Sequence, residues 1–275
     1  MNIENTILKL GIIGGGQISS KLCETASNFN IEVHVLDSNP SCIASGVADK
    51  VHTGKTTHVA TVVAFGKQMD LITCENLNTP LEALKQLQIE GIKVAPEADG
   101  LEILNDRGFQ KKHFNLHSLN TMAFNDYANS PEIQIAVERK RMKLPFIQKA
   151  KQKKHSMQTC KTIKLRNQIG DLLEGASITE AICDIETEFN VLISSHERGQ
   201  INSLNIDSPK ELSEEQTQKA FKISNTLIKS LEYQGALRVN FFLAKNGQIY
   251  INKAKMDIAE NTESHLKAIL GIPNS

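Results

Sequence analysis

A glycine-rich turn near the start of the chain has residue types and spacing that indicate anion binding. It follows an apolar segment and consists of Gly14, Gly15, Gly16 and Gln17. Ser19 stands where a dinucleotide-binding G-x-G-x-x-G pattern has its third glycine, and Asp37 lies 21 residues after Gly16. Glycines let a backbone approach an anion, and a helix that begins there offers free amides. A phosphate-binding loop, a dinucleotide site and a tight turn without ligand all remain open.

A second candidate is the basic segment 139–166, which contains 11 Lys and Arg residues and no Asp or Glu. The whole chain has 31 basic and 31 acidic residues, so the rest of it carries a net charge of −11. Such a segment favours an anionic partner, although a solvated basic face would have the same composition. Phe146 is its only aromatic residue, which argues against stacking on nucleic-acid bases. We therefore expect a nucleotide or another small anion rather than a nucleic acid.

The elements that must position these residues alternate along the first hundred positions. The patterns predict strands at 8–13, 31–36, 51–53, 70–74 and 92–95. They predict helices at 17–29, 57–69 and 80–90. Repeated β-α units of this length imply a parallel sheet covered by helices.

After Pro96 the pattern changes, and we expect a domain boundary near residue 97. Helices are predicted at 100–119 and 260–270, and another begins at Ser130, which we expect to be its cap. A further helix follows a capping box at 208–211 and includes the apolar spacing of 220–231. Strands are predicted at 144–149, 160–165 and 183–194. Asn246-Gly247 between two apolar segments predicts a hairpin with a type I′ turn. The fold class is therefore α/β.

Composition narrows the class of protein further. With 275 residues and 40% hydrophobic residues, the chain is typical of a globular protein of about two domains. No apolar run approaches the roughly 20 residues of a membrane span, and residues 1–9 lack a secretory pattern, so we expect a cytoplasmic protein without membrane contact. The five cysteines show no metal-ligand spacing and are expected to be reduced and mostly buried.

Three groups of segments, in the same order as in a known family, carry a resemblance. They are Gly11–Gln17 with Val35–Pro40; Asp70–Pro80 with Val94–Pro96 and Leu101–Arg107; and Gly235–Leu243 with Ile251–Asn252 and His265–Pro273. Together they resemble carboxyaminoimidazole ribonucleotide synthase, the ATPase subunit of phosphoribosylaminoimidazole carboxylase, which is an ATP-grasp enzyme of purine biosynthesis. The likeness is dense over residues 8–120 and patchy after 144.

The resemblance implies a pre-ATP-grasp domain at 1–97, a reduced ATP-grasp domain at 98–275, and a family C-terminal domain that is absent. It also implies ATP and Mg²⁺ as cofactors, bicarbonate and aminoimidazole ribonucleotide as substrates, and a homodimer. Arg107, Lys149, Glu174, Glu188 and Asn252 match ATP-binding positions. Gly14, Gly15, Gly16 and Gln17 match the loop on the side of the substrate phosphate.

This sequence departs from the family at the positions of the family's metal ligands and in its phosphate-covering loop. The two positions of its metal-ligating glutamates hold Asn240 and Lys253 here. Replacing two carboxylates by an amide and an ammonium changes the charge of the site by +3, and a like-charge contact near 4 Å costs about 4 kcal/mol at an effective dielectric of 20. The family's phosphate-covering loop is also changed, because no glycine occurs between Gly108 and Gly170. Magnesium binding is therefore not expected, and no catalytic residue is assigned.

Four hypotheses follow. In the first, the chain keeps the fold and nucleotide binding but has lost or weakened ligase activity. In the second, it is an active ligase in which Glu186 or Glu188 serves the metal. In the third, it is a non-enzymatic binding module for a nucleotide, a protein partner or, through residues 139–166, a polyanion. In the fourth, the glycine-rich turn belongs to a Rossmann oxidoreductase.

Overall fold

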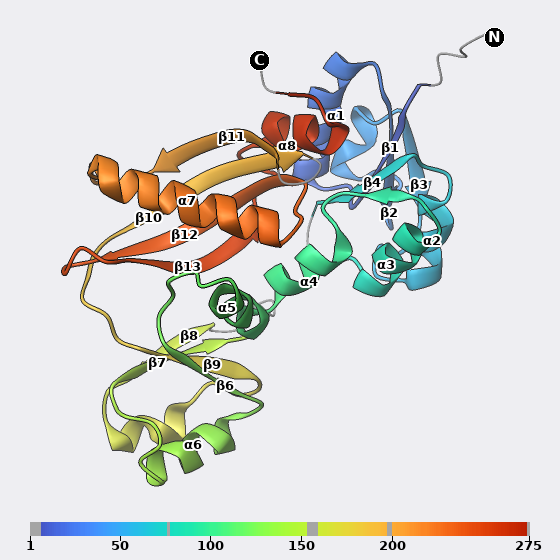
Figure 1. The fold of residues 1–275 in the computed structure, drawn as a ribbon. Helices are drawn as coiled ribbons and strands as arrows, with labels where there is room; N and C mark the ends of the chain where they lie inside the picture. The colour runs from blue at the N-terminus through green and yellow to red at the C-terminus, as the bar shows by residue number, and fades with distance from the viewer. Residues whose placement is uncertain (1–6, 76–77, 153–158, 197–199, 274–275) are drawn as a thin grey trace.

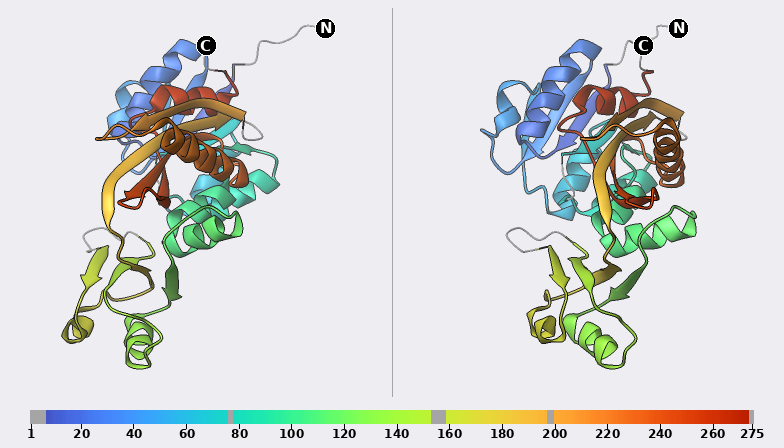
Figure 2. Two further views of the ribbon diagram at one scale, coloured as in Figure 1. Left: turned by 60° about the vertical axis from the view of Figure 1, so that its left-hand side comes forward. Right: turned by 90° about the vertical axis from the view of Figure 1, so that its left-hand side faces the viewer.

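The computed structural model describes residues 7–75, 78–152, 159–196 and 200–273. The chain forms a parallel sheet first, then a small antiparallel sheet, then a large antiparallel sheet (Figure 1). The small sheet and its helix project from the rest of the molecule in each view (Figure 2).

The parallel sheet has the strand order β3-β2-β1-β4-β5. Its strands are β1 (Lys9–Ile13), β2 (Glu32–Asp37), β3 (Lys50–Thr53), β4 (Leu71–Cys74) and β5 (Lys93–Val94). The helices between them are α1 (Gln17–Ala26), α2 (Val59–Gly66) and α3 (Leu81–Ile89). The structure confirms the alternating pattern read from the sequence, because parallel neighbours need a crossover that a helix supplies.

Helices cover both faces of the parallel sheet. On one face Leu10 and Ile12 pack with Leu22 of α1 and with Leu266 of α8 (Thr262–Leu270), which comes from the far end of the chain. On the other face α2 and α3 pack over Ile72. Burial from both sides explains why these strands are nearly continuous apolar runs.

The small sheet has the order β6-β9-β7-β8, and all its strand pairs are antiparallel. Its strands are β6 (Phe124–Tyr127), β7 (Phe146–Ala150), β8 (Cys160–Ile163) and β9 (Ser177–Ala181). The helix α6 (Ser130–Glu138) buries Ile133 and Val137 against Phe146 and Ile163 in a core separate from the main one. This unit therefore has its own hydrophobic support.

The large sheet has the order β11-β10-β12-β13. Its strands are β10 (Ile185–His196), β11 (Gln200–Asp207), β12 (Gly235–Ala244) and β13 (Ile249–Met256). The helix α7 (Glu214–Ser230) buries Ala220, Ile223 and Leu227 against it, which confirms the helical spacing of apolar residues in the sequence.

Buried His265 joins the parallel sheet to the large sheet. Its Nδ1 accepts a hydrogen bond from the Ala236 amide of β12, and its Nε2 lies 3.3 Å from the Thr73 hydroxyl of β4. Burial lowers the pKa of His265 to about 3, so the ring is neutral and its Nε2–H donates to Thr73. The two sheets are thus held by one imidazole as well as by apolar contact.

Several local expectations were wrong in detail. The helix expected over 100–119 is two helices, α4 (Ala98–Asn105) and α5 (Arg107–Leu116), because the Asp106 side chain caps the second one through the amides of Gly108 and Phe109. The cap of α6 is Asn129, whose side chain accepts from the Glu132 amide.

The expected capping box at 208–211 lies before the helix begins. The box that forms is Ser213 with Gln216, and the Ser208 hydroxyl instead donates to the Lys210 carbonyl. The hairpin at Asn246-Gly247 is confirmed, but only Gly247 has positive φ, at 79°. Four residues, 245–248, lie between the two strands, and the Gly247 amide donates to the Ala244 carbonyl, so the turn is not a two-residue type I′ turn.

Cys23, Cys42 and Cys74 are buried free thiols as expected, whereas Cys160 is exposed. Within the ranges that the structure describes, no helix is long and apolar enough to cross a membrane.

Candidate functional site

A cleft of about 330 Å³ opens between the small sheet and the large sheet, with α5 at its side. It gathers Arg107 from α5, Lys149 from β7, Glu188 from β10, and Asn252 and Lys253 from β13. These five residues are separated in sequence by up to 146 positions, and the folding of two sheets around α5 brings them together. Four of the five positions that match ATP-binding residues therefore share one cavity.

The floor of this cleft is a buried carboxylate between two lysines. Glu180 Oε1 lies 2.7 Å from Lys111 Nζ, and its Oε2 lies 2.5 Å from Lys149 Nζ. The Glu180 side chain is only 2% exposed. Burial would raise the pKa of the Glu180 carboxyl, but Lys111 and Lys149 together hold it below its usual value. The carboxylate fixes both ammonium groups in place.

Each lysine of the floor has further partners. Lys149 Nζ donates to Asn252 Oδ1 at 3.0 Å and lies 5.6 Å from the centre of the Phe242 ring. Lys111 Nζ donates to Thr121 Oγ1 at 2.6 Å. Burial lowers the pKa of Lys111 to about 8, so this ammonium is the more easily deprotonated group of the floor.

The upper part of the cleft holds two cations that face no carboxylate in the described ranges. Arg107 Nη1 donates to the Thr159 carbonyl and to Cys160 Sγ, at 3.4 and 3.2 Å. The Lys253 ammonium makes no hydrogen bond or ion pair with any residue that the structure describes. Burial, then Arg107 and Lys255, lower the pKa of Lys253. The cleft is lined by four cations and two carboxylates, and among the described residues Glu180 pairs only with Lys111 and Lys149, so the excess of positive charge suits an anion.

Asn240, the first of the two positions that the resemblance assigns to metal ligands, has an amide partner. Asn240 lies opposite Lys253 in the register of β12 and β13, and its Nδ2 donates to Asn190 Oδ1. Asn190 in turn donates to Asp207 Oδ2 at 3.2 Å. No group of three or more His, Cys, Asp or Glu residues that could hold a metal occurs among the described residues. These side chains do not fit a magnesium site.

Glu174 lies away from the cleft. It is exposed and lines a separate cavity of about 530 Å³ with Lys151, Lys161 and Asp171, whose lining residues on β7 and β8 alternate along the strands with those that line the cleft. Although this cavity is the larger one, its Lys151 already pairs with Asp126. We therefore place the candidate site in the smaller cleft. The segment that replaces the family's phosphate-covering loop falls mostly at 153–158, outside the described residues.

The glycine loop, Gly14–Gln17, has its central amides occupied by carboxylates of the protein itself. The Gly15 amide donates to Asp37 Oδ2 at 2.8 Å, and the Gly16 amide donates to Glu75 Oε2 at 3.0 Å. The amide and hydroxyl of Ser19 also donate to Glu75 Oε2. A Cβ at Gly16 would come within 2.6 Å of Glu75 Oε1. A phosphate at this loop would have to displace Glu75.

Sequence reasoning missed two residues of the cleft floor, Lys111 and Glu180. Lys111 follows Arg107 by four positions, so the spacing of one helical face was a signal for it. Glu180 lies on β9, a strand that was not predicted, and only the register of β9 with β7 brings it to Lys149.

Known protein sequences share similarity with this chain over most of its length. Residues 7–105 match the ribonucleotide synthetase preATP-grasp domain family. The chain is 23% identical over 306 residues to a chloroplastic phosphoribosylaminoimidazole carboxylase of Vigna aconitifolia, covering 96% of this chain and 52% of that protein. It is 24% identical over 262 residues to N5-carboxyaminoimidazole ribonucleotide synthase of Staphylococcus aureus strain COL, covering 89% and 68%.

Solved structures share the fold. A crystal structure of N5-carboxyaminoimidazole ribonucleotide synthetase from Thermotoga maritima superposes with a TM-score of 0.88 at 24% identity, covering 98% of this chain and 77% of that one. The Staphylococcus aureus synthetase complexed with ADP gives a TM-score of 0.83 at 21% identity, covering 98% of this chain and 78% of that one. Residues 7–105 therefore resemble a pre-ATP-grasp domain, and the chain as a whole shares the fold of these N5-carboxyaminoimidazole ribonucleotide synthetase structures.

Proposed function

We propose that this chain binds an adenine nucleotide such as ATP in the cleft without a divalent metal, and that the ligase activity named for its relatives is lost or weakened. In this proposal residues 98–275 form the nucleotide-binding domain and residues 1–97 the domain before it. Lys253 carries the proposal, because it places an ammonium group without a carboxylate partner in the described cleft.

Two kinds of surface in the cleft support a nucleotide. Ile147, Ile178 and Phe242 give it an apolar wall that can cover a planar base, while Glu188 offers oxygens to a ribose hydroxyl. Arg107, Lys149 and Lys253 present positive charge suited to phosphates. Related structures were solved in complex with ADP and with ATP. Together these features favour a phosphorylated nucleoside over a simple anion.

The same residues explain why metal is not needed. In ATP-grasp enzymes Mg²⁺ neutralises phosphate charge, and a hard cation needs oxygen ligands for this. Here Lys253 supplies positive charge directly, and the Asn240 amide is held by Asn190. Metal-free ATP, which carries more negative charge than its magnesium complex, is therefore the better ligand.

Rearranged metal ligands are the competing explanation. Glu186 is engaged by Lys210 in an ion pair, which leaves Glu188 as the cleft carboxylate without a lysine in the described ranges. One carboxylate beside four cations is a poor site for Mg²⁺.

Calorimetry with ATP, in chelator and in excess Mg²⁺, tests the proposal. We expect ATP to bind in chelator at least as tightly as in Mg²⁺. Lys253→Ala should weaken metal-free binding about tenfold, or about 1.4 kcal/mol. Lys245→Ala is the matched control, since Lys245 is exposed in the hairpin just before the same strand and lies outside the cleft. Binding that needs Mg²⁺ would contradict metal independence.

The proposal that ligase activity is lost or weakened has a separate test. Wild-type protein mixed with ATP, Mg²⁺, bicarbonate and aminoimidazole ribonucleotide should release no more ADP than the Lys253→Ala variant. Substantial turnover that Lys253→Ala abolishes would show that the chain is a working ligase.

A further inference from the structure

Six cations gather at the outer end of the small sheet, away from the nucleotide cleft. They are Arg139, Lys140, Arg141, Lys143, Lys164 and Arg166, and we call them the basic tip. The first four lie in the turn between α6 and β7, and the other two follow β8. Because Phe146 at the start of β7 pairs with Ile163 at the end of β8, the two turns meet side by side.

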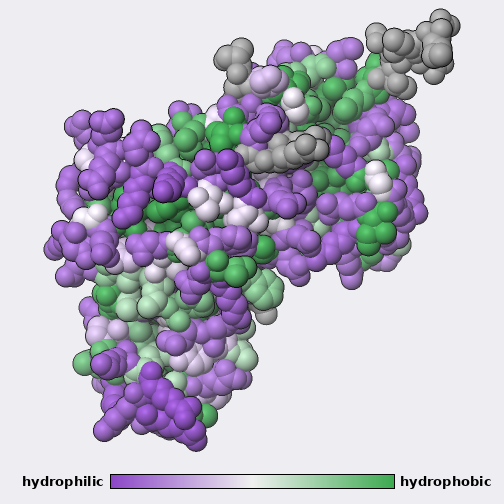
Figure 3. Space-filling model, viewed as in Figure 1, coloured by the Kyte–Doolittle hydropathy of each residue, from purple (hydrophilic) through white to green (hydrophobic). Residues whose placement is uncertain are grey.

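The basic tip differs from the other cations of segment 139–166 that the structure describes, because it has no acidic partner among the described residues. Lys149, Lys151 and Lys161 pair with Glu180, Asp126 and Asp171. All six side chains of the tip are exposed, and no ion pair joins them to a carboxylate within the described ranges. The surface at this end is strongly hydrophilic (Figure 3). The fold therefore concentrates positive charge at the basic tip without placing carboxylates there to neutralise that charge.

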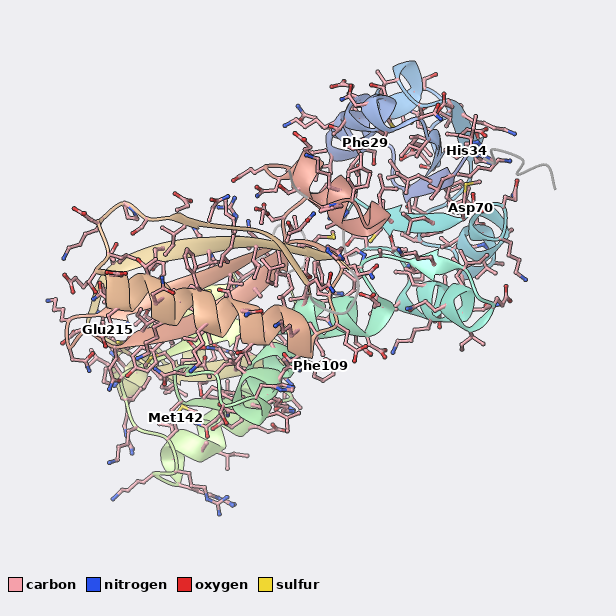
Figure 4. The ribbon with its side chains drawn as sticks, turned by 45° about the horizontal axis from the view of Figure 1, so that its top comes forward. Phe29, His34, Asp70, Phe109, Met142 and Glu215 are labelled. Carbon is pink, nitrogen blue, oxygen red and sulfur yellow. The ribbon has the colours of Figure 1, made fainter. Side chains whose placement is uncertain are left out.

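The turns that carry these cations are ordered by the fold. Met142 lies between Arg141 and Lys143 and is buried in the core under α6 (Figure 4). The amides of Arg141 and Met142 both donate to the Ala136 carbonyl. Buried Met142 thus anchors the chain while its neighbours project outward. Gln168 Oε1 accepts from the amides of Lys164 and Leu165, which fixes the second turn.

Holding like charges together is unfavourable unless an anion neutralises them. Neither cavity described above is lined by the basic tip, so a single small anion has no pocket there. Phe146 is buried and Tyr127 packs against the same core, so neither offers a face for stacking bases. Three of the six cations are arginines, which bind phosphate oxygens in pairs. An extended chain of phosphate groups, contacted through its oxygens alone, fits these features.

We propose that the basic tip binds the phosphate chain of a polyanion, the backbone of a duplex nucleic acid or an inorganic polyphosphate. This proposal is independent of ATP binding, since none of its six residues lines the cleft. The contact reads no bases and depends on salt because each neutralised phosphate releases counterions.

Fluorescence anisotropy tests the proposal with two labelled probes, a random-sequence DNA duplex and a long inorganic polyphosphate. The variant Arg139→Gln/Arg141→Gln/Lys143→Gln removes three charges of the tip. The control Lys219→Gln/Lys222→Gln/Lys229→Gln removes three charges from the exposed face of α7. Both variants have the same net charge, so a general charge effect would act on them equally.

We expect binding of at least one probe at about 50 mM salt and a steep loss toward about 200 mM. The tip variant should bind at least tenfold more weakly and lower the slope of log affinity against log salt by about 2.7, since each phosphate contact contributes about 0.9. The control should match the wild type. Binding of one probe and not the other identifies the source of the phosphate chain.

Four results would overturn the proposal. The first is no binding of either probe at low salt, and the second is an equal loss in both triple variants. The third is equal or tighter binding of poly-glutamate, which would assign the tip to an acidic protein partner. Excess ATP that displaces the probe from wild type and from the tip variant alike would place the polyanion in the cleft instead.

Discussion

The glycine loop and the cationic cleft both suggest anion binding from sequence, yet they differ in which of their groups are occupied. In the glycine loop, Asp37 and Glu75 already accept from the amides of Gly15 and Gly16. In the cleft, Arg107 and Lys253 face no carboxylate that the structure describes. A phosphate entering the loop must displace the protein's own charge, whereas one entering the cleft meets unneutralised cations.

This difference shows what a glycine pattern can and cannot establish. A side chain at position 16 would push the Glu75 carboxylate away from the amides that donate to it, so the protein's own carboxylate is sufficient reason for a glycine there. Anion binding is indicated better by donors that lack partners than by the residues that allow close approach. The predictions below test the two regions against each other.

The largest effect is expected from the floor of the cleft. Glu180→Ala would leave Lys111 and Lys149 buried without their shared carboxylate, at a cost of about 3–5 kcal/mol of unfolding free energy. Urea unfolding measures this cost. Glu186→Ala is the control, since its partner Lys210 is more than half exposed, and it should cost less than about 1 kcal/mol. Equal costs for both variants would show that the floor is not held by this ion triad.

The glycine loop should respond to removal of its internal anion. Glu75→Ala deletes the acceptor of the Gly16 and Ser19 amides, and should lower the unfolding free energy by about 1.5–3 kcal/mol. Added inorganic phosphate should then stabilise the variant but not the wild type, because the freed amides can bind it.

Thermal unfolding with and without phosphate provides the measurement for Glu75→Ala. Glu24→Ala, on the exposed side of α1, is the control and should show neither effect. Wild-type protein that phosphate stabilises more than the variant would mean that the loop binds phosphate with Glu75 in place, as the sequence first suggested.

The sequence predicted the parallel sheet well and the cleft only in part, for a physical reason. Strands buried on both faces form apolar runs that are visible locally, and a helix follows each of them. The strands β6, β9 and β11 were missed because at least one side of each is polar or carries charge, such as Glu180 on β9. Their positions are set by pairing with distant strands.

Local polar competition explains the remaining errors. Asp106 interrupts an otherwise continuous helical pattern by capping α5, and Ser213 provides a better helix start than Ser208 because Gln216 completes its box. Arg107, Lys149, Glu188 and Asn252 were identified through resemblance and share the cleft, while Glu174 lies elsewhere. Glu180, by contrast, becomes visible only once β9 pairs with β7.

Metal-free ATP binding should weaken as pH rises. Burial lowers the pKa of Lys111 to about 8 and also lowers that of Lys253, so the cleft loses positive charge above about pH 8, whereas ordinary lysines keep theirs. We expect about a tenfold loss of affinity, or about 1.4 kcal/mol, between pH 7 and 9. Calorimetry in buffers of different ionisation enthalpy should show proton uptake on binding at pH 8, and this uptake should be smaller in Lys253→Ala. Affinity that does not change with pH would contradict a role for these ammonium groups.

The smallest effect is a change in the reactivity of one cysteine, which also reports where the nucleotide sits. Cys160 is exposed and lines the cleft beside Arg107, whereas burial raises the pKa of Cys23 and of Cys74 to about 12. Iodoacetamide should therefore alkylate Cys160 in preference to these buried thiols. Saturating metal-free ATP should slow that alkylation about fivefold, since phosphates drawn to Arg107 would cover the thiol. This corresponds to about 1 kcal/mol in activation free energy.

Mass spectrometry of the alkylated peptides resolves each site, and partly exposed Cys183 provides an internal control outside the cleft. Protection of Cys183 without protection of Cys160 would place the nucleotide away from the cations, and inorganic phosphate at the same concentration would show whether the base is needed to hold it.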